Sequence, residues 1–529
     1  MIHTFPAVKK AIVLLVAIGF LVYFPTFFGS FIWDDEDFVY QNQYVKEFRI
    51  NKFLSENAIA GRGKISNYYR PIQLTTYAMV QKIFGFQPIV YHATSIIVHI
   101  AATLVVFLFL YLFINDRFVA FITSLVFLIH PVQTESVSYV SGLSDPLFVL
   151  FLFLSFYFYL RTSVSRNYFF LSIISFVLAL LSKELAVVGM GIIVLLSILV
   201  RRNQRRTDIP FLMVYELAGF LYLILRFTLL KFQSIERIWE GTLYGSSIVL
   251  RLATFFHNFF VYLFLLVFPK DLYMERDFTV MVEKNIINRW TLLFLLFHIA
   301  LFILFKLLAR KRMEQVRHVL FFYGAFLISI LPFTGVIPLN GIFYEHYLYL
   351  PMIFFWGFVC TIFKPILQKK VGIVILYIII TLFIIRSYAR QYEWIDTVRF
   401  YEQTLTRAPK STRIINNLGM EQANRGKLDQ AIATYEKGLI IDPSVPNFYH
   451  NLANAYKTKG DFSKAEELYY KAIKVDPNFY FSYLSLIQLY FDRGHKEQAM
   501  EFLKNKAIPA FPNIQNIQLL YNQLQKEKQ

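Results

Sequence analysis

Apolar runs separated by short polar segments fill most of the chain. The runs recur from residue 11 to residue 388 and are about 16–22 residues long, close to the ~20 that a helix needs to cross ~30 Å of hydrocarbon. The run 248–268 is interrupted by Arg251, His257 and Asn258. The pattern predicts a polytopic, all-α membrane domain with candidate spans at 11–32, 92–114, 118–132, 146–160, 168–182, 185–200, 209–230, 248–268, 290–308, 319–337, 348–363 and 371–388.

Short basic loops assign the two sides of the membrane. Lys9 and Lys10 precede the first run, "RRNQRR" (201–206) follows the sixth, and "ARKRMEQVR" (309–317) comes later. Since basic residues gather in cytoplasmic loops, all three segments are predicted to be cytoplasmic. The second and third of these loops lie on the same side, so the chain crosses the membrane an even number of times between them. Three apolar runs lie there, and the interrupted run 248–268 is therefore predicted to lie in the interface or to re-enter. The result is about 11 spans, with the N-terminus inside and the residues after 390 outside.

The first run has the position of a secretory signal peptide. It is too long for one and lacks an A-x-A cleavage site, and it leads directly into an acidic stretch. We therefore expect a retained first span. The domain is an integral part of the cytoplasmic membrane, or of the endoplasmic reticulum membrane in a eukaryote, and membrane lipids are its surroundings.

Composition agrees with the membrane assignment and excludes two other classes. Hydrophobic residues make up 57% of the 529 positions, well above the fraction that is typical of soluble proteins. The net charge of +18 could indicate nucleic-acid binding, but the basic residues cluster in the short loops that topology explains, so no nucleic-acid partner is expected. The single cysteine, Cys360, excludes an internal disulfide and a cysteine-built metal site.

Acidic residues gather on the face predicted to be external. The stretch "FIWDDEDFVYQN" (31–42) opens the long loop 33–91, and "TESVSYVSGLSD", "SKE" and "YEH" reach the same side by the same count. Ionisable groups at span ends are costly to desolvate and usually mark a site, although any one of them could be a solvated loop residue. The acids of this face are Asp34, Asp35, Glu36, Asp37, Glu135, Asp145, Glu184 and Glu345.

The polar tail repeats itself every 34 residues. Glycine recurs at 426, 460 and 494, alanine at 431, 465 and 499, and proline closes the units at 409, 443 and 477. This period is typical of tetratricopeptide repeats, which form a concave surface that holds a peptide or a protein. We predict a membrane domain over 1–390 and an external repeat domain over 391–529, with a partial unit at 394–409 and three full repeats at about 413–513. A spacer or dimerisation module is the alternative.

Five ordered motifs and the repeat tail resemble one family. They are "FIWDD" at the end of the first span, "YYRPIQLTTY" (68–77), "FLIHPVQTESVSYVSGLSD" (127–145), "LLSKE" (180–184) and "GIFYEHYLYLP" (341–351). The whole is similar to the transmembrane-and-TPR-containing protein O-mannosyltransferases, of the GT-C glycosyltransferase type, in a more compact form. The resemblance implies a GT-C helix bundle followed by a TPR α-solenoid.

The resemblance also implies a reaction. Such an inverting enzyme transfers a sugar from a polyprenyl-phosphate donor to a Ser or Thr hydroxyl of an exported protein, and an acid at the start of the first external loop is the base. That role falls on Asp34, with Asp35 beside it. Two departures concern the donor phosphate: Leu143 and His346 stand where the family usually has arginine.

The residues suggest how this chemistry is done. A carboxylate within hydrogen-bond reach can accept the proton of the attacking hydroxyl, and we assign this to Asp34. Repulsion among the neighbouring acids would raise one pKa, or a Mg²⁺ or Mn²⁺ ion bridging Asp34 and Asp35 would relieve it; the spacing does not decide. The candidates to bind the donor phosphate are Arg70, Lys183, Arg226 and His346, of which Arg70 fits best because its planar fork matches phosphate.

Two other functions stay open. An O-antigen-type polysaccharide ligase or polymerase would place its key basic residues in a large late external loop, whereas here the early loop 33–91 carries the acids. A non-catalytic membrane scaffold, whose tail recruits exported partners, would tolerate neutral residues at Asp34 and Asp35. In the favoured interpretation the TPR domain holds the acceptor protein.

Overall fold

The described chain is helical throughout. The computed structural model describes residues 7–200, 205–230, 239, 242–309, 313–337, 339–512 and 517, and these contain no β-strand. Residues 201–204 and 310–312 of the two basic loops, and the end of the third repeat at 513, lie outside the described residues. Contacts divide the chain into two compact units, Met1–Asp396 and Thr397–Gln529. The predicted all-α class is confirmed.

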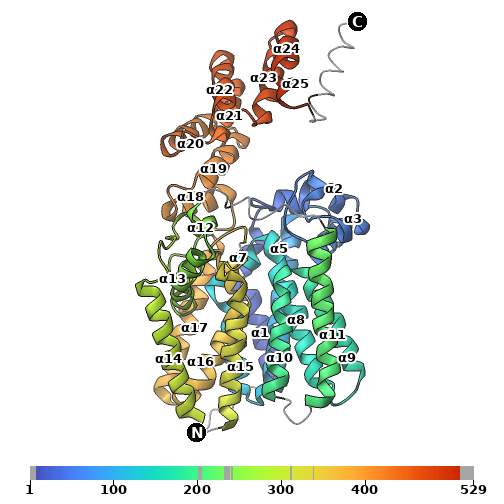
Figure 1. Cartoon of the computed structure of the whole chain (residues 1–529), viewed down its shortest axis with the longest axis vertical. Helices are drawn as coiled ribbons and strands as arrows, with labels where there is room; N and C mark the ends of the chain where they lie inside the picture. Colours follow the sequence, from blue (N-terminus) through green and yellow to red (C-terminus); the bar gives the residue numbers. More distant parts are fainter. Residues whose placement is uncertain are drawn as a thin grey trace. The chain divides into compact units, whose positions relative to one another are not determined.

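Apolar helices form the first unit, as Figure 1 shows. Each apolar run of the sequence falls on one of them, because a segment in hydrocarbon has to pair its own backbone N–H and C=O groups, as a helix does. They are α1 (Val8–Val22), α5 (Pro88–Ile114), α6 (Arg117–Ile129), α8 (Ser144–Arg161), α9 (Asn167–Ser182), α10 (Val188–Val200), α11 (Arg205–Ile224), α13 (Ile248–Val267), α14 (Arg289–Ala309), α15 (Met313–Ile330), α16 (Pro351–Leu367) and α17 (Lys370–Gln391).

The chain is an integral membrane protein, but the predicted count of about 11 spans stays a prediction. Within the described residues, seven helices are long and apolar enough to cross a membrane, or eight if the bent pair Arg117–Ile129 and Pro131–Ser138 is one span. The first run is shorter as an α-helix than its apolar length suggests. α1 ends at Val22 and a 3-10 segment, η1 (Phe24–Phe28), follows, because Pro25 cannot continue the α-helical hydrogen bonds.

The two ends of the bundle differ in their charged residues. The end that we call the acidic end is formed by residues 31–42, 130–145, 183–187 and 341–350, which include the acids named in the sequence analysis. At the opposite end, an ion pair between Asp116 and Lys364 joins the start of α6 to the last turns of α16. In Figure 1 the helices α2 and α3 of the first long loop lie at the upper end of the bundle.

Short helices build the acidic end. The loop 33–91 holds η2 (Glu36–Tyr40), α2 (Gln43–Lys46), α3 (Ile50–Ser55), η3 (Ala60–Arg62) and α4 (Pro71–Phe84). The other connections of this unit contain η4 (Pro131–Gln133), α7 (Thr134–Ser138), η5 (Val140–Leu143), η6 (Glu184–Val187), η8 (Leu225–Leu229), α12 (Leu243–Ser246), η10 (Arg276–Phe278), η11 (Leu331–Thr334) and η12 (Glu345–Leu348).

Helix α13 makes polar contacts near both of its ends. Near its start, Arg251 Nε donates to the carbonyl of Gly335, which follows α15, at 2.6 Å. Near its end, the carbonyl of Leu266 is 3.2 Å from Nε2 of His130, which follows α6. α13 is as long and apolar as the candidate spans, so whether 248–268 crosses the membrane stays a prediction.

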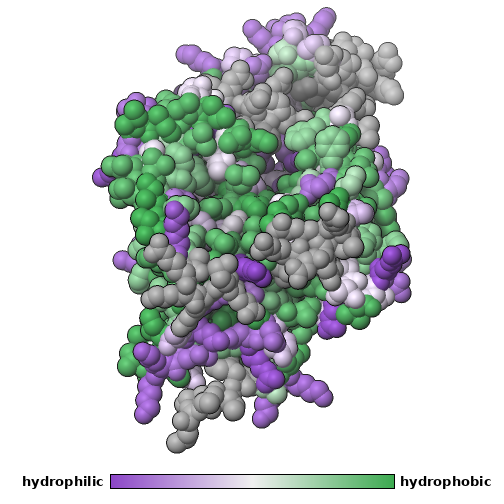
Figure 2. Space-filling view, turned by 60° about the horizontal axis from the view of Figure 1, so that its bottom comes forward, coloured by the Kyte–Doolittle hydropathy of each residue, from purple (hydrophilic) through white to green (hydrophobic). Residues whose placement is uncertain are grey.

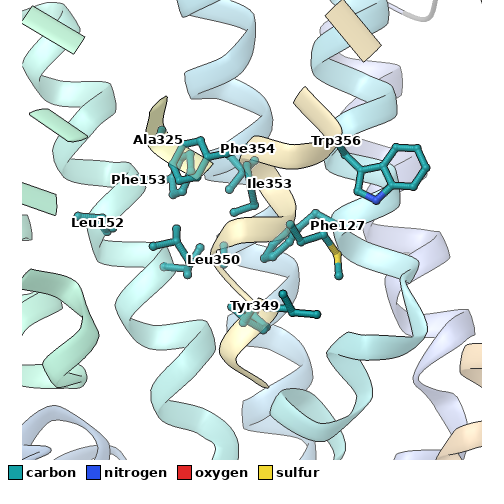
Figure 3. Close-up of a cluster of buried hydrophobic side chains, with 14 of the residues drawn as sticks. Phe127, Leu152, Phe153, Ala325, Tyr349, Leu350, Ile353, Phe354 and Trp356 are labelled. Carbon is teal, nitrogen blue, oxygen red and sulfur yellow. The ribbon is translucent and has the colours of Figure 1, made fainter. Parts of the chain in front are cut away.

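Aromatic and aliphatic side chains fill the space between α6, α8, α15 and α16 (Figure 3). Phe153 stacks on Phe354 with ring centroids 5.9 Å apart, and Phe127 meets Tyr349 edge to face at 5.1 Å. On the face seen in Figure 2, apolar side chains cover much of the middle, and hydrophilic ones gather toward its lower edge. In the most apolar stretch of α14 no residue is buried, so lipid is the medium that this helix meets.

The second unit is a row of helix pairs. The glycines in register, Gly426, Gly460 and Gly494, all have positive φ (74° to 86°), which lets the chain leave one helix and enter the next. The alanines in register at 431, 465 and 499 are completely buried where paired helices cross. The predicted α-solenoid is confirmed, while the bounds of its single repeats stay a prediction. Its helices are α18 (Thr397–Arg407), α19 (Thr412–Asn424), α20 (Leu428–Ile441), α21 (Pro446–Lys459), α22 (Phe462–Val475), α23 (Tyr480–Asp492), α24 (Lys496–Phe502), η13 (Leu503–Ala507) and α25 (Ile508–Ala510).

Topology gives a first test. A reporter that is active only outside the cytoplasm should be active when fused after residue 390 and inactive when fused after Arg206. The reason is that Arg390 lies at the acidic end, whereas α10 runs away from that end toward the basic loop. Activity assays on cells carrying each fusion provide the measurement. The opposite result for the first fusion would mean that 248–268 crosses the membrane.

Candidate active site

The two aspartates that end the first span face different surroundings. Asp35 is buried; its Oδ2 accepts from the Ile32 N–H at 2.9 Å, and its Oδ1 accepts from the N–H and Oγ of Ser141 at 2.7 and 2.5 Å. Burial raises the pKa of Asp35 to about 7, and these hydrogen bonds oppose that rise. Asp34 is half-buried, and its backbone N–H donates to Tyr139 Oη at 3.0 Å. Asp34 is therefore the more accessible of the two carboxylates.

The next two acids form surface ion pairs. Asp37 lies 2.6 Å from Lys64 Nζ and 3.5 Å from Arg62 Nε, and Glu36 lies 3.5 Å from Arg62 Nη2. These pairs tie η2 to the segment after η3. The repulsion expected within the run 34–37 is thus relieved locally by cations of the same loop.

Arg70 lies where the long loop enters α4. Its guanidinium stacks over the Tyr68 ring at 4.4 Å, and Nη2 donates to Glu184 Oε1 at 3.3 Å. Its Nε is buried and has no hydrogen-bond partner within the described part of the chain. Burial raises the pKa of Tyr68; Arg70 opposes the rise, and Asp34 and Glu184 add to it. Asp34 and Arg70 therefore both act electrostatically on the same phenol, and Arg70 is in direct contact with its ring.

Three of the four predicted phosphate-binding residues surround Glu184. Burial alone would raise the pKa of this carboxyl group, but Arg70, Arg226 and Lys183 lower it to about 2. Arg226 also donates through Nη2 to the carbonyl of Asn67, at 2.7 Å, in the loop that carries Arg70. The structure thus brings together cations from the start of α4, from η8 and from the end of α9, of which Arg70 lies more than a hundred positions before the other two.

Lys183 is paired with an acid from another helix. Its Nζ lies 2.6 Å from Asp145 Oδ1, and both side chains are buried. Burial lowers the pKa of Lys183, and the Asp145 carboxylate opposes that change. A paired lysine at this position can still stabilise an anion nearby, because ammonium is a point charge with three donors.

His346 completes the predicted set and pairs with Glu135. Its Nδ1 lies 2.6 Å from Glu135 Oε1, and its backbone N–H donates to Oε2 at 3.3 Å. Burial lowers the pKa of His346 to about 3, and Lys183 acts in the same direction. The ring lines a small hollow, with room for about one water molecule, whose other walls are mostly apolar: Phe148, Leu185, Val188, Ser329, Phe333, Tyr347, Leu350 and Pro351.

Glu345 is held by two arginines that the sequence analysis did not single out. Oε1 lies 3.3 Å from Arg276 Nη2, Oε2 lies 2.7 Å from Arg390 Nη2, and the Tyr273 N–H donates to Oε1 at 2.6 Å. Glu345 and Arg390 are almost completely buried. The sequence held one indication of this cluster. Arg386 and Arg390 lie at or just after the end of the last predicted span that is predicted to be external, where basic residues are uncommon.

The residues do not fit a metal ion held jointly by Asp34 and Asp35. Both oxygens of Asp35 accept hydrogen bonds from N–H or O–H groups, so they are turned away from the position of a bridging ion. Over the part of the chain that the structure describes, no group of three or more His, Cys, Asp or Glu side chains is arranged to hold a metal. We therefore derive no step through Mg²⁺ or Mn²⁺.

Glu345→Gln tests the buried cluster. The change removes the negative charge shared by Arg276 and Arg390, and it should lower the free energy of unfolding by about 3–5 kcal/mol. Thermal unfolding of the protein in lipid, followed by circular dichroism, gives the comparison. The control Asp37→Asn breaks an exposed pair with Lys64 and should cost less than about 1 kcal/mol. Equal effects of the two changes would contradict a stabilising role for the cluster.

Two family models match the tail. The model described as "Tetratricopeptide repeat" covers residues 446–479, and the one described as "TPR repeat" covers 422–460. Among solved structures, the first TPR of Spaghetti (RPAP3) bound to an HSP90 peptide is 22% identical, with a TM-score of 0.21, and covers 22% of this chain and 95% of that one.

Curated relatives match most of the chain. The Caenorhabditis elegans protein O-mannosyl-transferase F38B6.6 is 24% identical over 437 residues, which cover 79% of this chain and 60% of that protein. The human protein O-mannosyl-transferase TMTC3 is 21% identical over 461 residues, which cover 80% of this chain and 50% of that protein. The matches thus span 50–60% of the length of these two relatives. They confirm the resemblance seen in the motifs: over about four-fifths of its length, this chain is similar to the transmembrane-and-TPR-containing protein O-mannosyltransferases.

Proposed function

We propose that this chain is a membrane glycosyltransferase that moves a sugar from a polyprenyl-phosphate carrier to a Ser or Thr hydroxyl of an exported protein. The observation that carries the proposal is the convergence, at one end of an apolar bundle, of an accessible acid with a cation cluster. Asp34 and Arg70 both act electrostatically on Tyr68, and Arg226 and Lys183 meet Arg70 around Glu184. The similarity to proteins named protein O-mannosyl-transferases supports it.

Asp34 is the proposed base. The acceptor oxygen attacks the anomeric carbon from the face opposite the phosphate, a C–O bond forms, and the bond from that carbon to the phosphate oxygen breaks, so the configuration inverts. The proton of the acceptor hydroxyl passes to the Asp34 carboxylate. Asp34 suits the role because it is half-buried and near Tyr68 and Arg70, whereas Asp35 is buried and turned to Ser141.

The cation cluster stabilises the leaving group. The lipid phosphate gains negative charge as the sugar departs. Cationic side chains placed around it therefore bind the transition state more tightly than they bind the lipid-linked sugar. Arg70 fits this role because its buried Nε has no hydrogen-bond partner among the described residues, and buried N–H groups are almost always paired. Lys183, Arg226 and His346 lie around the same position.

We place the lipid part of the donor on the side of His346, because the small hollow there has mostly apolar walls. Its walls come from α8, α15, α16 and the start of α10, and most of its lining side chains are apolar. An isoprenoid chain on this side would leave its phosphate next to His346 and the Lys183–Asp145 pair. The acidic end is proposed to face the outside, or the lumen of the endoplasmic reticulum, where exported acceptors arrive.

Asp34→Asn should lower the rate of sugar transfer at least about 100-fold, because it removes the base while keeping size and polarity. Initial rates with lipid donor and acceptor peptide give the measurement, and donor binding should stay largely intact. Asp37→Asn, an equal change of charge three residues along the chain, serves as the control and should stay near the parent rate. Transfer by Asp34→Asn at the parent rate would rule out the proposed mechanism and favour a non-catalytic scaffold.

Arg70→Lys should keep a positive charge but lose the planar guanidinium and its Nε–H. The KM for the lipid-linked sugar should rise about tenfold, equal to about 1.4 kcal/mol, and Arg70→Ala should raise this KM further. Rates measured against varied donor at saturating acceptor separate KM from kcat. An unchanged donor dependence would move the phosphate site to Lys183, Arg226 or His346.

The repeat domain is proposed to hold the acceptor protein near the site. Tethering raises the effective concentration of the acceptor without changing the chemistry, so deletion of 412–529 should sharply reduce transfer to a full-length protein and affect a short acceptor peptide much less. Parallel assays with the two acceptors provide the measurement. Equal losses would indicate that the tail supports the membrane domain, and no loss for either acceptor would make the tail a spacer or an oligomer contact.

A further inference from the structure

We propose that Asp35, Ser141 and Tyr139 are positioning residues that hold Asp34 in place and join it to the helix that begins beside Arg70. The inference rests on the proposed role of Asp34 as the base. It assigns the second aspartate of the pair to orientation of the turn rather than to proton transfer, and it gives functions to two residues that precede α8.

The turn that carries Asp34 has an unfavourable backbone conformation. Trp33 has a φ of 53°, in the left-handed region that bulky side chains rarely adopt. The turn closes through the Asp35 N–H, which donates to the carbonyl of Ile32 at 3.1 Å, and the Glu36 N–H, which donates to the carbonyl of Trp33 at 3.2 Å. Such a conformation persists only where the surroundings over-determine it.

Contacts on both sides of the turn provide that constraint. The Asp35 carboxylate accepts from Ile32 within the turn and from Ser141 outside it, and the Asp34 N–H donates to Tyr139 Oη. Asp35 is 1% exposed, so its side chain points into the protein. Asp34 remains half-buried and lies near Tyr68.

The segment 139–141 is itself fixed to α4. Gln73 Nε2 donates to the carbonyl of Ser141 at 2.8 Å, and Tyr77 Oη donates to the carbonyl of Val140 at 2.6 Å. Both donors are completely buried or nearly so, and they lie one and two turns after Arg70, the residue that caps α4. A chain of buried hydrogen bonds thus runs from Asp35, the neighbour of Asp34, through Ser141 to the first turns of α4.

This frame would fix the separation between the base and the phosphate-binding arginine. Asp34 and Arg70 approach opposite sides of the reacting carbon in the proposed mechanism, and displacement by about 1 Å at such a site can cost 100-fold in rate. Asp35 cannot itself take the acceptor proton, because it is buried and its oxygens face three donors.

Variants that remove one hydroxyl each test the proposal. Ser141→Ala deletes the Oγ donor and keeps the N–H that Asp35 also uses. Tyr139→Phe deletes the hydroxyl that accepts from the Asp34 N–H and also bonds to the Ser141 side chain. With the full chain in lipid, polyprenyl-phosphate mannose and an acceptor peptide, each should lower kcat about 10-fold and change the donor KM less than about twofold. Ser141→Thr, which retains the hydroxyl, should recover most of the rate, and Asp37→Asn is the matched surface control.

A double variant separates positioning from a purely structural role. If Ser141 acts through Asp34, then Asp34→Asn combined with Ser141→Ala should be no slower than Asp34→Asn alone. Additive losses, or parent kcat values for both Ser141→Ala and Tyr139→Phe while Asp34→Asn is inactive, would overturn the inference. Parent activity in Asp34→Asn would instead overturn the proposed function. If Ser141→Ala does not fold, Tyr139→Phe in the same cycle with Asp34→Asn decides.

Discussion

Burial of charge at the end of an apolar helix bundle is the constraint on which the rest of this site depends. An ion moved from water into such surroundings loses several kcal/mol of solvation, which only well-placed partners offset. Lys183 meets Asp145, Arg70 meets Glu184, and Glu345 meets Arg276 and Arg390. Because each pair joins segments far apart in the sequence, the contacts that make these charges tolerable also fix the loops that carry them.

The pairs differ in what they leave available. Glu345 is enclosed by two guanidinium groups and a backbone N–H, which suits a role in holding η12 and α17 together. Arg70 keeps a buried donor, its Nε, without a hydrogen-bond partner within the described chain, beside the Tyr68 ring and near Asp34. Such a group in a native protein calls for an explanation, and an anion bound during the reaction provides one.

The two aspartates illustrate how neighbours in sequence acquire different roles. Asp34 and Asp35 have the same chemistry, but a left-handed residue before them sends their side chains to different surroundings. One meets Ser141 in the protein interior, while the other stays half-buried near the cation cluster. The environment, rather than the residue type, therefore separates the anchor from the candidate base.

The sequence by itself determined the helical spans and the repeat tail, because both are periodic. A run of apolar residues has to satisfy its backbone as a helix in lipid, and a 34-residue period repeats one packing solution. The motifs also placed the acids and Arg70 on one face. The pairings required the tertiary structure: Arg276 and Arg390 around Glu345, Ser141 against Asp35, and His346 against Glu135. Periodicity indicates the surroundings of a segment. A salt bridge or a hydrogen bond depends on an approach within about 3 Å between residues that here lie 45 to 211 positions apart, which only the packed bundle decides.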